Sequence, residues 1–166
     1  MGKEKGKNEK ESFLNEVKPT IQDIVEGFFR ENNSEELVKI LVGTTDGEGK
    51  VKESLLEEFI SRLKGGLSFT KVRKYYEQFL SIYEEAFREH PGKKKDDGPL
   101  PAEILVKLYL LKSHVVYDEA RERSKEFAAF KEFINSLILK VNTFKALEKA
   151  KNLFEAFIGY AKAKLD

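Results

Sequence analysis

The sequence of 166 residues contains no cysteine, which excludes a disulfide framework and a zinc site with thiolate ligands. It also lacks any run approaching the roughly 18 consecutive apolar residues of a membrane-spanning helix. The first residues, MGKEKGKNEKES, lack the apolar stretch of a secretory signal peptide. These absences predict a soluble protein of the cytoplasm with no membrane partner.

An excess of charge of one sign is missing too, because 30 Lys and Arg residues face 29 Asp and Glu residues, for a formal net charge of +1. This balance excludes a histone-like polycation but permits a basic face on part of the surface. Any surface that binds nucleic acid must therefore be local.

The length suits one domain, and 40% hydrophobic residues, including 13 Phe, are enough to close one core. Residues 1–12 are charged and poor in apolar side chains, so we expect a flexible tail there. We expect a single helical domain over residues 13–166.

Apolar residues recur at helical spacing through this domain, which predicts an all-α fold, a compact bundle of about six to seven helices with no strand. Ser34, Ser124 and Thr143 are placed to cap helices. The segment 101–123 is apolar nearly all round, which predicts a helix at the centre of the bundle. The other expected helices follow Pro19 and Ser34 and cover about 55–63, 70–90, 124–141 and 143–165.

The linker TTDGEGKV, residues 44–51, partly fits the loop of an EF-hand calcium site. Its first position would be Thr44 instead of Asp, and its last, which should supply a bidentate acid, would be Leu55. We interpret the linker as a Gly-Asp turn.

Catalytic and metal-binding patterns are also missing. The only histidines are His90 and His114, and neither lies in a metal-binding spacing on a helix. No Gly-x-Ser-x-Gly elbow is present. We therefore expect no enzyme, no catalytic residue, no metal and no cofactor.

Basic and aromatic residues are mixed in FTKVRKYYEQF, residues 69–79. If Thr70 caps this helix, Lys71, Arg73 and Lys74 lie in its first turn, where acids would be the stabilising residues. The predicted apolar stripe holds Val72, Tyr76, Phe79, Tyr83 and Ala86. Bases at the positive end of a helix predict an anion or nearby carboxylates that offset them.

A second mixed group lies on the helix expected over 101–123. His114, Tyr117 and Arg121 fall on one stripe, Lys112 on another, and Arg123 follows at the helix end. Alternatively, Tyr117 packs in the core and Arg121 pairs with an acid such as Asp118 or Glu122.

Three segments, taken together and in order, resemble the small subunit family of type III-A CRISPR-Cas effector (Csm) complexes. They are LSFTKVRKYYEQF, LLKSHVVYDEARE and FEAFIGYAK, and the resemblance covers residues 67–164. Lys71, Arg73, Lys112, Tyr117 and Arg121 match residues of the family pattern. His114 stands where a second base is usual, and Ala120 replaces a glycine.

The resemblance implies a non-catalytic, all-helical subunit that stacks along a guide RNA and a single-stranded target RNA. Its partners would be these RNAs, other Csm subunits and further copies of itself. RNA would be bound by its backbone, without reading of sequence, at Lys71, Arg73, Lys74, Lys112, His114, Arg121 and Arg123. A helical DNA-binding transcriptional regulator is the alternative, and a catalytic bundle ranks third.

Overall fold

The computed structural model describes residues 20–30, 34–93 and 97–165, so the expected tail at 1–12 lies outside the described residues. The prediction of an all-α bundle of about six to seven helices is confirmed. The seven described helices are α2 (Ile21–Phe29), α3 (Ser34–Leu41), α4 (Leu55–Ser61), α5 (Phe69–Glu89), α6 (Ala102–Glu122), α7 (Lys125–Lys140) and α8 (Phe144–Leu165). No helix in these ranges is long and apolar enough to cross a membrane.

The helices start where side-chain oxygens can accept from free backbone amides. Ser124 Oγ accepts from Phe127 N at 3.1 Å, and Thr143 Oγ1 accepts from Ala146 N at 3.1 Å, as expected for caps. The prediction that Thr70 caps α5 is wrong, because Ser68 is the cap and accepts from Lys71 N at 3.2 Å. Thr70 therefore lies inside the first turn.

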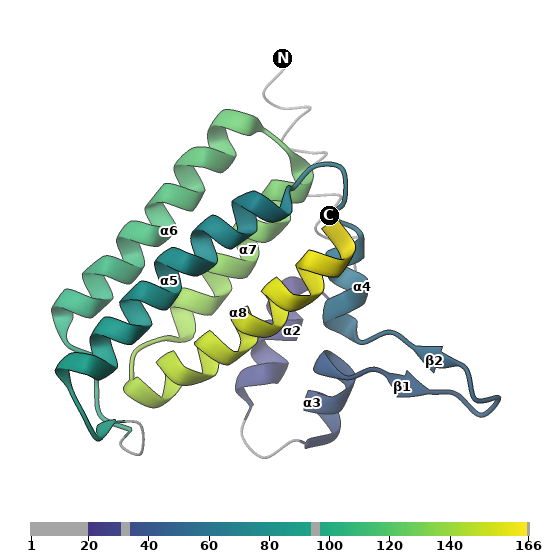
Figure 1. Cartoon of the computed structure of the whole chain (residues 1–166), viewed down its shortest axis with the longest axis horizontal. Helices are drawn as coiled ribbons and strands as arrows, with labels where there is room; N and C mark the ends of the chain where they lie inside the picture. The colour runs from purple at the N-terminus through teal and green to yellow at the C-terminus, as the bar shows by residue number, and fades with distance from the viewer. Residues whose placement is uncertain (1–19, 31–33, 94–96, 166) are drawn as a thin grey trace.

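The core is built from phenylalanine rings around α8, which packs on α4, α5 and α7 (Figure 1). Phe133 of α7 and Phe157 of α8 are fully buried and stack with ring centroids 4.4 Å apart. Phe130 and Phe154 close the same cluster. Because one connected set of buried side chains joins α2 to α8, the described helices share one core.

The prediction that the helix over 101–123 lies at the centre of the bundle is wrong. α6 packs mainly on α5 and α7 and forms the outer edge of the bundle (Figure 1). Its buried stripe has ordinary helical spacing, with Ile104, Leu108, Leu111 and Val115 pointing inward. Five further large apolar residues of this helix are exposed, which the sequence pattern could not distinguish from burial on all sides: Val106, Tyr109, Leu110, Val116 and Tyr117.

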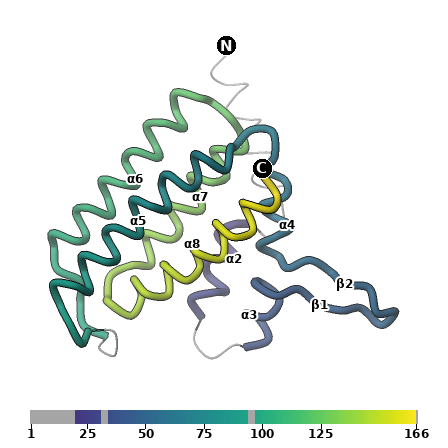
Figure 2. Tube along the Cα trace, in the orientation of Figure 1, coloured from purple at the N-terminus to yellow at the C-terminus, as the bar shows by residue number. Residues whose placement is uncertain are grey.

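The expectation of no strand is also wrong, because Thr44–Thr45 pairs antiparallel with Val51–Lys52 in a short hairpin that projects from the helices (Figure 2). Strands of two residues are too short to give a periodic signal. Asp46 Oδ1 accepts from the backbone amides of Glu48 and Lys50, each at 2.9 Å. The side chain of Asp46 therefore stabilises the turn.

Candidate nucleic-acid interface

The first turn of α5 lies beside the last turn of α6, because the two helices pack side by side in opposite directions (Figure 2). Near one end of the pair, Tyr75 contacts Asp118; near the other, Lys107 Nζ lies 2.5 Å from Glu85 Oε1. This arrangement brings basic residues from two distant parts of the sequence together. We call Lys71, Lys74, Arg121 and Arg123 the basic end.

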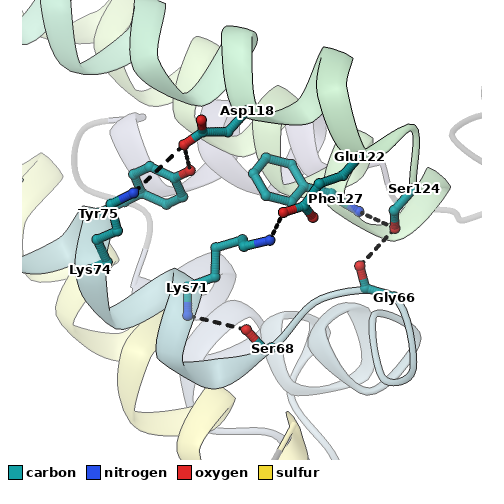
Figure 3. Close-up of polar contacts among 9 residues, drawn as sticks. All are labelled: Gly66, Ser68, Lys71, Lys74, Tyr75, Asp118, Glu122, Ser124 and Phe127. Atoms are coloured by element: carbon teal, nitrogen blue, oxygen red, sulfur yellow. Dashed lines mark hydrogen bonds and ion pairs between the residues drawn. The ribbon is translucent and has the colours of Figure 1, made fainter.

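Two connecting turns are held together beside the basic end. Ser124 Oγ donates to the backbone carbonyl of Gly66 at 2.7 Å, which joins the turn after α4 to the turn between α6 and α7 (Figure 3). A Cβ atom at Gly66 would collide with the side chain of Glu126, so only glycine fits here without a shift. This contact fixes the start of α5 relative to the end of α6.

Lys71 points from α5 toward α6, where its ammonium group pairs with the carboxylate of Glu122 (Figure 3). The same ammonium lies 5.1 Å from the centroid of the buried Phe127 ring, within the range of a cation–π contact. The side chain of Lys71 is 28% exposed to solvent. Lys71 is therefore partly buried, and the carboxylate of Glu122 already offsets its positive charge.

Lys74 lies one turn further along the same edge, with its Nζ 3.7 Å from Asp118 Oδ2 and 58% of its side chain exposed. The hydroxyl of Tyr75 donates to the same carboxylate oxygen (Figure 3). Burial, followed by this hydrogen bond, raises the pKa of Tyr75. Asp118 is thus the partner of both the buried hydroxyl of Tyr75 and the exposed ammonium group of Lys74.

The two arginines at the end of α6 are exposed. The guanidinium carbon of Arg121 lies 5.7 Å from the ring centroid of Tyr117, and Tyr117 is 63% exposed. The interpretation that Tyr117 packs in the core is therefore wrong. Asp118 and Glu122 pair with Lys74 and Lys71, and no acid pairs with Arg121 among the residues that the structure describes.

Arg123 ends α6 with a left-handed backbone, at φ 56°, and its amide donates to Glu119 O at 2.9 Å. A positive φ is uncommon for a residue other than glycine. The conformation turns the chain sharply from α6 into α7. The Arg123 side chain is exposed.

Three other predicted residues lie apart from the basic end. Arg73 points outward from α5, and its Nε pairs with Glu77 Oε1 of the same helix at 2.9 Å. His114 is exposed on the same stripe of α6 as Arg121, about two turns earlier.

Lys112, which the resemblance implies as an RNA-binding residue, lies apart from the start of α5. It is about 13 Å from Arg121 along the axis of α6. It shares a stripe with Glu119, whose carboxylate lies 3.4 Å from Lys131 of α7. Lys112 therefore lies on the margin of α6 that faces α7, with its Nζ 5.5 Å from the Tyr109 ring centroid.

Sequence reasoning missed Lys162 of α8 as a candidate. Its Nζ lies 5.0 Å from the ring centroid of Phe69, the first residue of α5, so α8 adds a further cation near this helix start. The sequence feature that could have indicated Lys162 is its position at the end of FEAFIGYAK, one of the three segments that carry the family resemblance. The spatial proximity of Lys162 and Phe69 depends on the packing of α5 against α8.

Within the described ranges, one group of possible metal ligands is found, formed by Glu89, His90 and Glu103. It lies at the opposite end of the α5–α6 pair from the basic end. The acids there act on Lys107, whose pKa is raised first by its hydrogen bond to Glu85 and also by Glu89 and Glu103. The ammonium group of Lys107 therefore already offsets part of the negative charge of these acids.

The sequence of the chain is similar to that of one known protein family. A model of the family Csm2 Type III-A matches residues 48–165. No curated protein and no solved structure matches the chain. The matched segment begins in the hairpin and includes α4 to α8, which carry every residue of the basic end.

Proposed function

Since the chain belongs to the Csm2 Type III-A family and is a small subunit of a type III-A CRISPR Csm complex, we propose that it binds the RNA backbone in that complex. In this proposal it stacks in several copies along the guide RNA and the single-stranded target RNA in the cytoplasm. It contacts phosphates without reading base sequence, and it has no catalytic role.

The observation that carries the proposal is that Lys74, Arg121 and Arg123 are all exposed at the end of the helix pair where α5 begins and α6 ends. The first turn of α5 contains no acid, so the partial positive charge of its amides is uncompensated within the turn. An arginine can hold a phosphate with two parallel hydrogen bonds, and a lysine acts as a mobile point charge. Such groups suit a chain of phosphates whose bases vary.

The acids that face Lys71 and Lys74 fit this proposal. Exposed ion pairs contribute only about 0–1 kcal/mol, so a phosphate can replace a carboxylate as the partner of a lysine at small cost. In the free protein, Glu122 and Asp118 hold the two ammonium groups near the helix start. The lysines are then already positioned when RNA arrives.

The alternative of a DNA-binding regulator lacks a supporting observation. A recognition helix must present side chains near its start to base edges. In α5, Val72 and Tyr75 are 0% and 1% exposed, and Lys71 is paired toward α6. Few side chains remain there to read a major groove.

Binding of labelled single-stranded RNAs of unrelated sequence, measured by fluorescence anisotropy at several salt concentrations, tests the proposal. We expect Arg121→Ala and Lys74→Ala to weaken binding of every RNA alike. Each should reduce the slope of log K against log salt by about 0.7, the contribution of one phosphate contact on a single strand. Lys145→Ala, at an exposed position at the start of α8, is the matched control.

Because one subunit makes few phosphate contacts, the full-length chain should bind weakly alone and more tightly when several copies lie in register. Unchanged binding in both variants would contradict the proposed surface. Loss of binding at one duplex DNA sequence only would support the regulator instead.

A further inference from the structure

The end of α5 and the start of α6 bring together three side chains of metal-binding type, which we call the three-ligand cluster. Glu89 is the last residue of α5, His90 is its C-cap, and Glu103 lies in the first turn of α6. One potential ligand atom from each residue lies within 4.8 Å of the other two. The expectation of no metal considered spacing along one helix, which cannot reveal ligands that come from two helices.

The imidazole of His90 contains a buried nitrogen without a partner. Its Nε2 atom has no hydrogen bond among the residues that the structure describes. Most buried polar side-chain atoms have a partner, and an unpaired one costs free energy. The ring packs on Phe144, with ring centroids 5.5 Å apart, so the imidazole is held against the core. A metal ion bound to this nitrogen would satisfy it.

The two acids of the three-ligand cluster are available as ligands. Glu89 and Glu103 are exposed, and neither forms an ion pair within the described ranges. The nearby base, Lys107, pairs with Glu85 instead, with its Nζ 2.5 Å from each carboxylate oxygen. Glu89 and Glu103 act on Lys107 less strongly than Glu85 does. Their carboxylates therefore keep negative charge that a second cation can use.

We propose that Glu89, His90 and Glu103 bind a divalent transition-metal ion, and that zinc fits them best. Imidazole nitrogen and carboxylate oxygen are both common zinc ligands, whereas calcium and magnesium take oxygen ligands. Two carboxylates and a neutral imidazole balance the double positive charge of the ion. Three protein ligands leave the fourth position of a tetrahedral site to water.

The spacing of the three-ligand cluster suits zinc after a small movement. Ligand atoms about 2.0–2.1 Å from a tetrahedral zinc ion lie about 3.3 Å from one another. The present separation of up to 4.8 Å must therefore close by at most about 1.5 Å. Rotation about the side-chain bonds of the exposed Glu89 and Glu103 can supply this movement, while Phe144 holds the ring of His90.

A bound ion would join the end of α5 to the start of α6 across the connection over residues 91–101. Because the ligands are brought together only in the folded chain, zinc should stabilise the fold by mass action. Glu89 is about 22 Å from Lys74 along the axis of α5. The metal site is therefore independent of the proposed RNA surface, and either can fail while the other holds.

Isothermal titration of the metal-free, full-length chain with zinc chloride tests the site. We expect one ion per chain with a dissociation constant in the micromolar range. The midpoint of thermal unfolding should rise with zinc, and EDTA should reverse the rise. In NMR spectra, the imidazole signals of His90 should shift on addition of zinc, while those of His114 should not.

Substitutions identify the ligands. His90→Ala should raise the dissociation constant for zinc by at least about tenfold, whereas His114→Ala, at an exposed site on α6, should leave it unchanged. Glu103→Gln removes a second ligand and should also weaken binding by at least about tenfold. Glu84→Gln is its matched control at another exposed site. Lys107→Gln should tighten binding about threefold, because it removes a positive charge that repels the ion.

Three results would overturn the proposed metal site. They are a dissociation constant above about 1 mM, equal losses of binding in His90→Ala and His114→Ala, and full binding by Glu103→Gln. Weaker binding by Lys107→Gln would also count against the site, because zinc would then depend on a group that should repel it.

Discussion

The carboxylate of Asp118 on α6 accepts a hydrogen bond from the buried hydroxyl of Tyr75 on α5, and the same oxygen lies 3.7 Å from Lys74 Nζ. One acid therefore links the packing of the two helices to the exposed charge beside them. Changes to either partner should be visible in the stability of the protein as well as in its binding.

Replacing Tyr75 by Phe should reduce the loss of stability at alkaline pH. Burial raises the pKa of Tyr75 above its ordinary value of about 10, so above that pH an unfolded chain releases this proton while the folded chain keeps it. The unfolded state then binds fewer protons, and the free energy of unfolding falls as pH rises. Urea unfolding at several values between pH 8 and pH 12 should give a shallower decline for Tyr75→Phe.

At neutral pH, where both states keep the proton, the same variant should lose about 1 kcal/mol through the missing hydrogen bond to Asp118. An equal alkaline slope in the two proteins would show that Tyr75 does not contribute to it.

Replacing Glu122 by Gln should strengthen RNA binding by about threefold. The change removes the charge that competes with phosphate for Lys71, and an exposed pair is worth at most about 1 kcal/mol. Glu84→Gln removes the same charge from an exposed site far along α5 and serves as the comparison in the anisotropy assay. Weaker binding by Glu122→Gln would mean that Glu122 is needed to position Lys71.

Lys162→Ala should weaken binding of all single-stranded RNAs, although Lys162 lies on a different helix from the basic end. Its ammonium lies over Phe69 at the start of α5, so it can contribute to the same phosphate path. The salt slope should fall by about 0.7 relative to wild type. Lys145→Ala at the opposite end of α8 should change neither quantity; equal effects of the two variants would exclude a specific role for Lys162.

Phe133→Ala should lower the free energy of unfolding by about 3–5 kcal/mol, because it removes a fully buried ring that stacks on Phe157 and leaves a cavity. Leu139→Ala, on the same helix but 74% exposed, should change it by less than about 0.5 kcal/mol. Chemical denaturation monitored by circular dichroism measures both. Similar losses would contradict the described core.

Gly43→Ala should destabilise the junction between α3 and the hairpin by about 1–3 kcal/mol. Gly43 has φ +86°, which favours glycine, and an added Cβ would collide with the backbone carbonyl oxygen of Lys52. Gly47→Ala in the same hairpin meets open space and is the control. Amide hydrogen exchange in residues 42–54 would report the change, and equal protection in both variants would argue against strain at Gly43.

Much of the fold could be predicted because helices depend on contacts within a few residues. Ser124 and Thr143 each precede a helical pattern, and the structure confirms both as caps. On α5, however, the predicted stripe included Tyr76, whereas the structure buries Tyr75 more completely. The helix packs between α6 and α8, so its buried surface extends past the single stripe that periodicity assigns.

The sequence by itself determined the helical class, most helix starts and the positions of the bases, because backbone hydrogen bonds and caps act over a few residues. Tertiary structure alone decided that α6 is an outer helix, that Lys112 lies apart from Arg121 and that Lys162 lies near the start of α5. An apolar helix can bury any of its sides, and the choice depends on contacts between residues far apart in the chain. Those contacts place Glu122 beside Lys71 and leave apolar residues of α6 such as Leu110 and Tyr117 exposed to solvent.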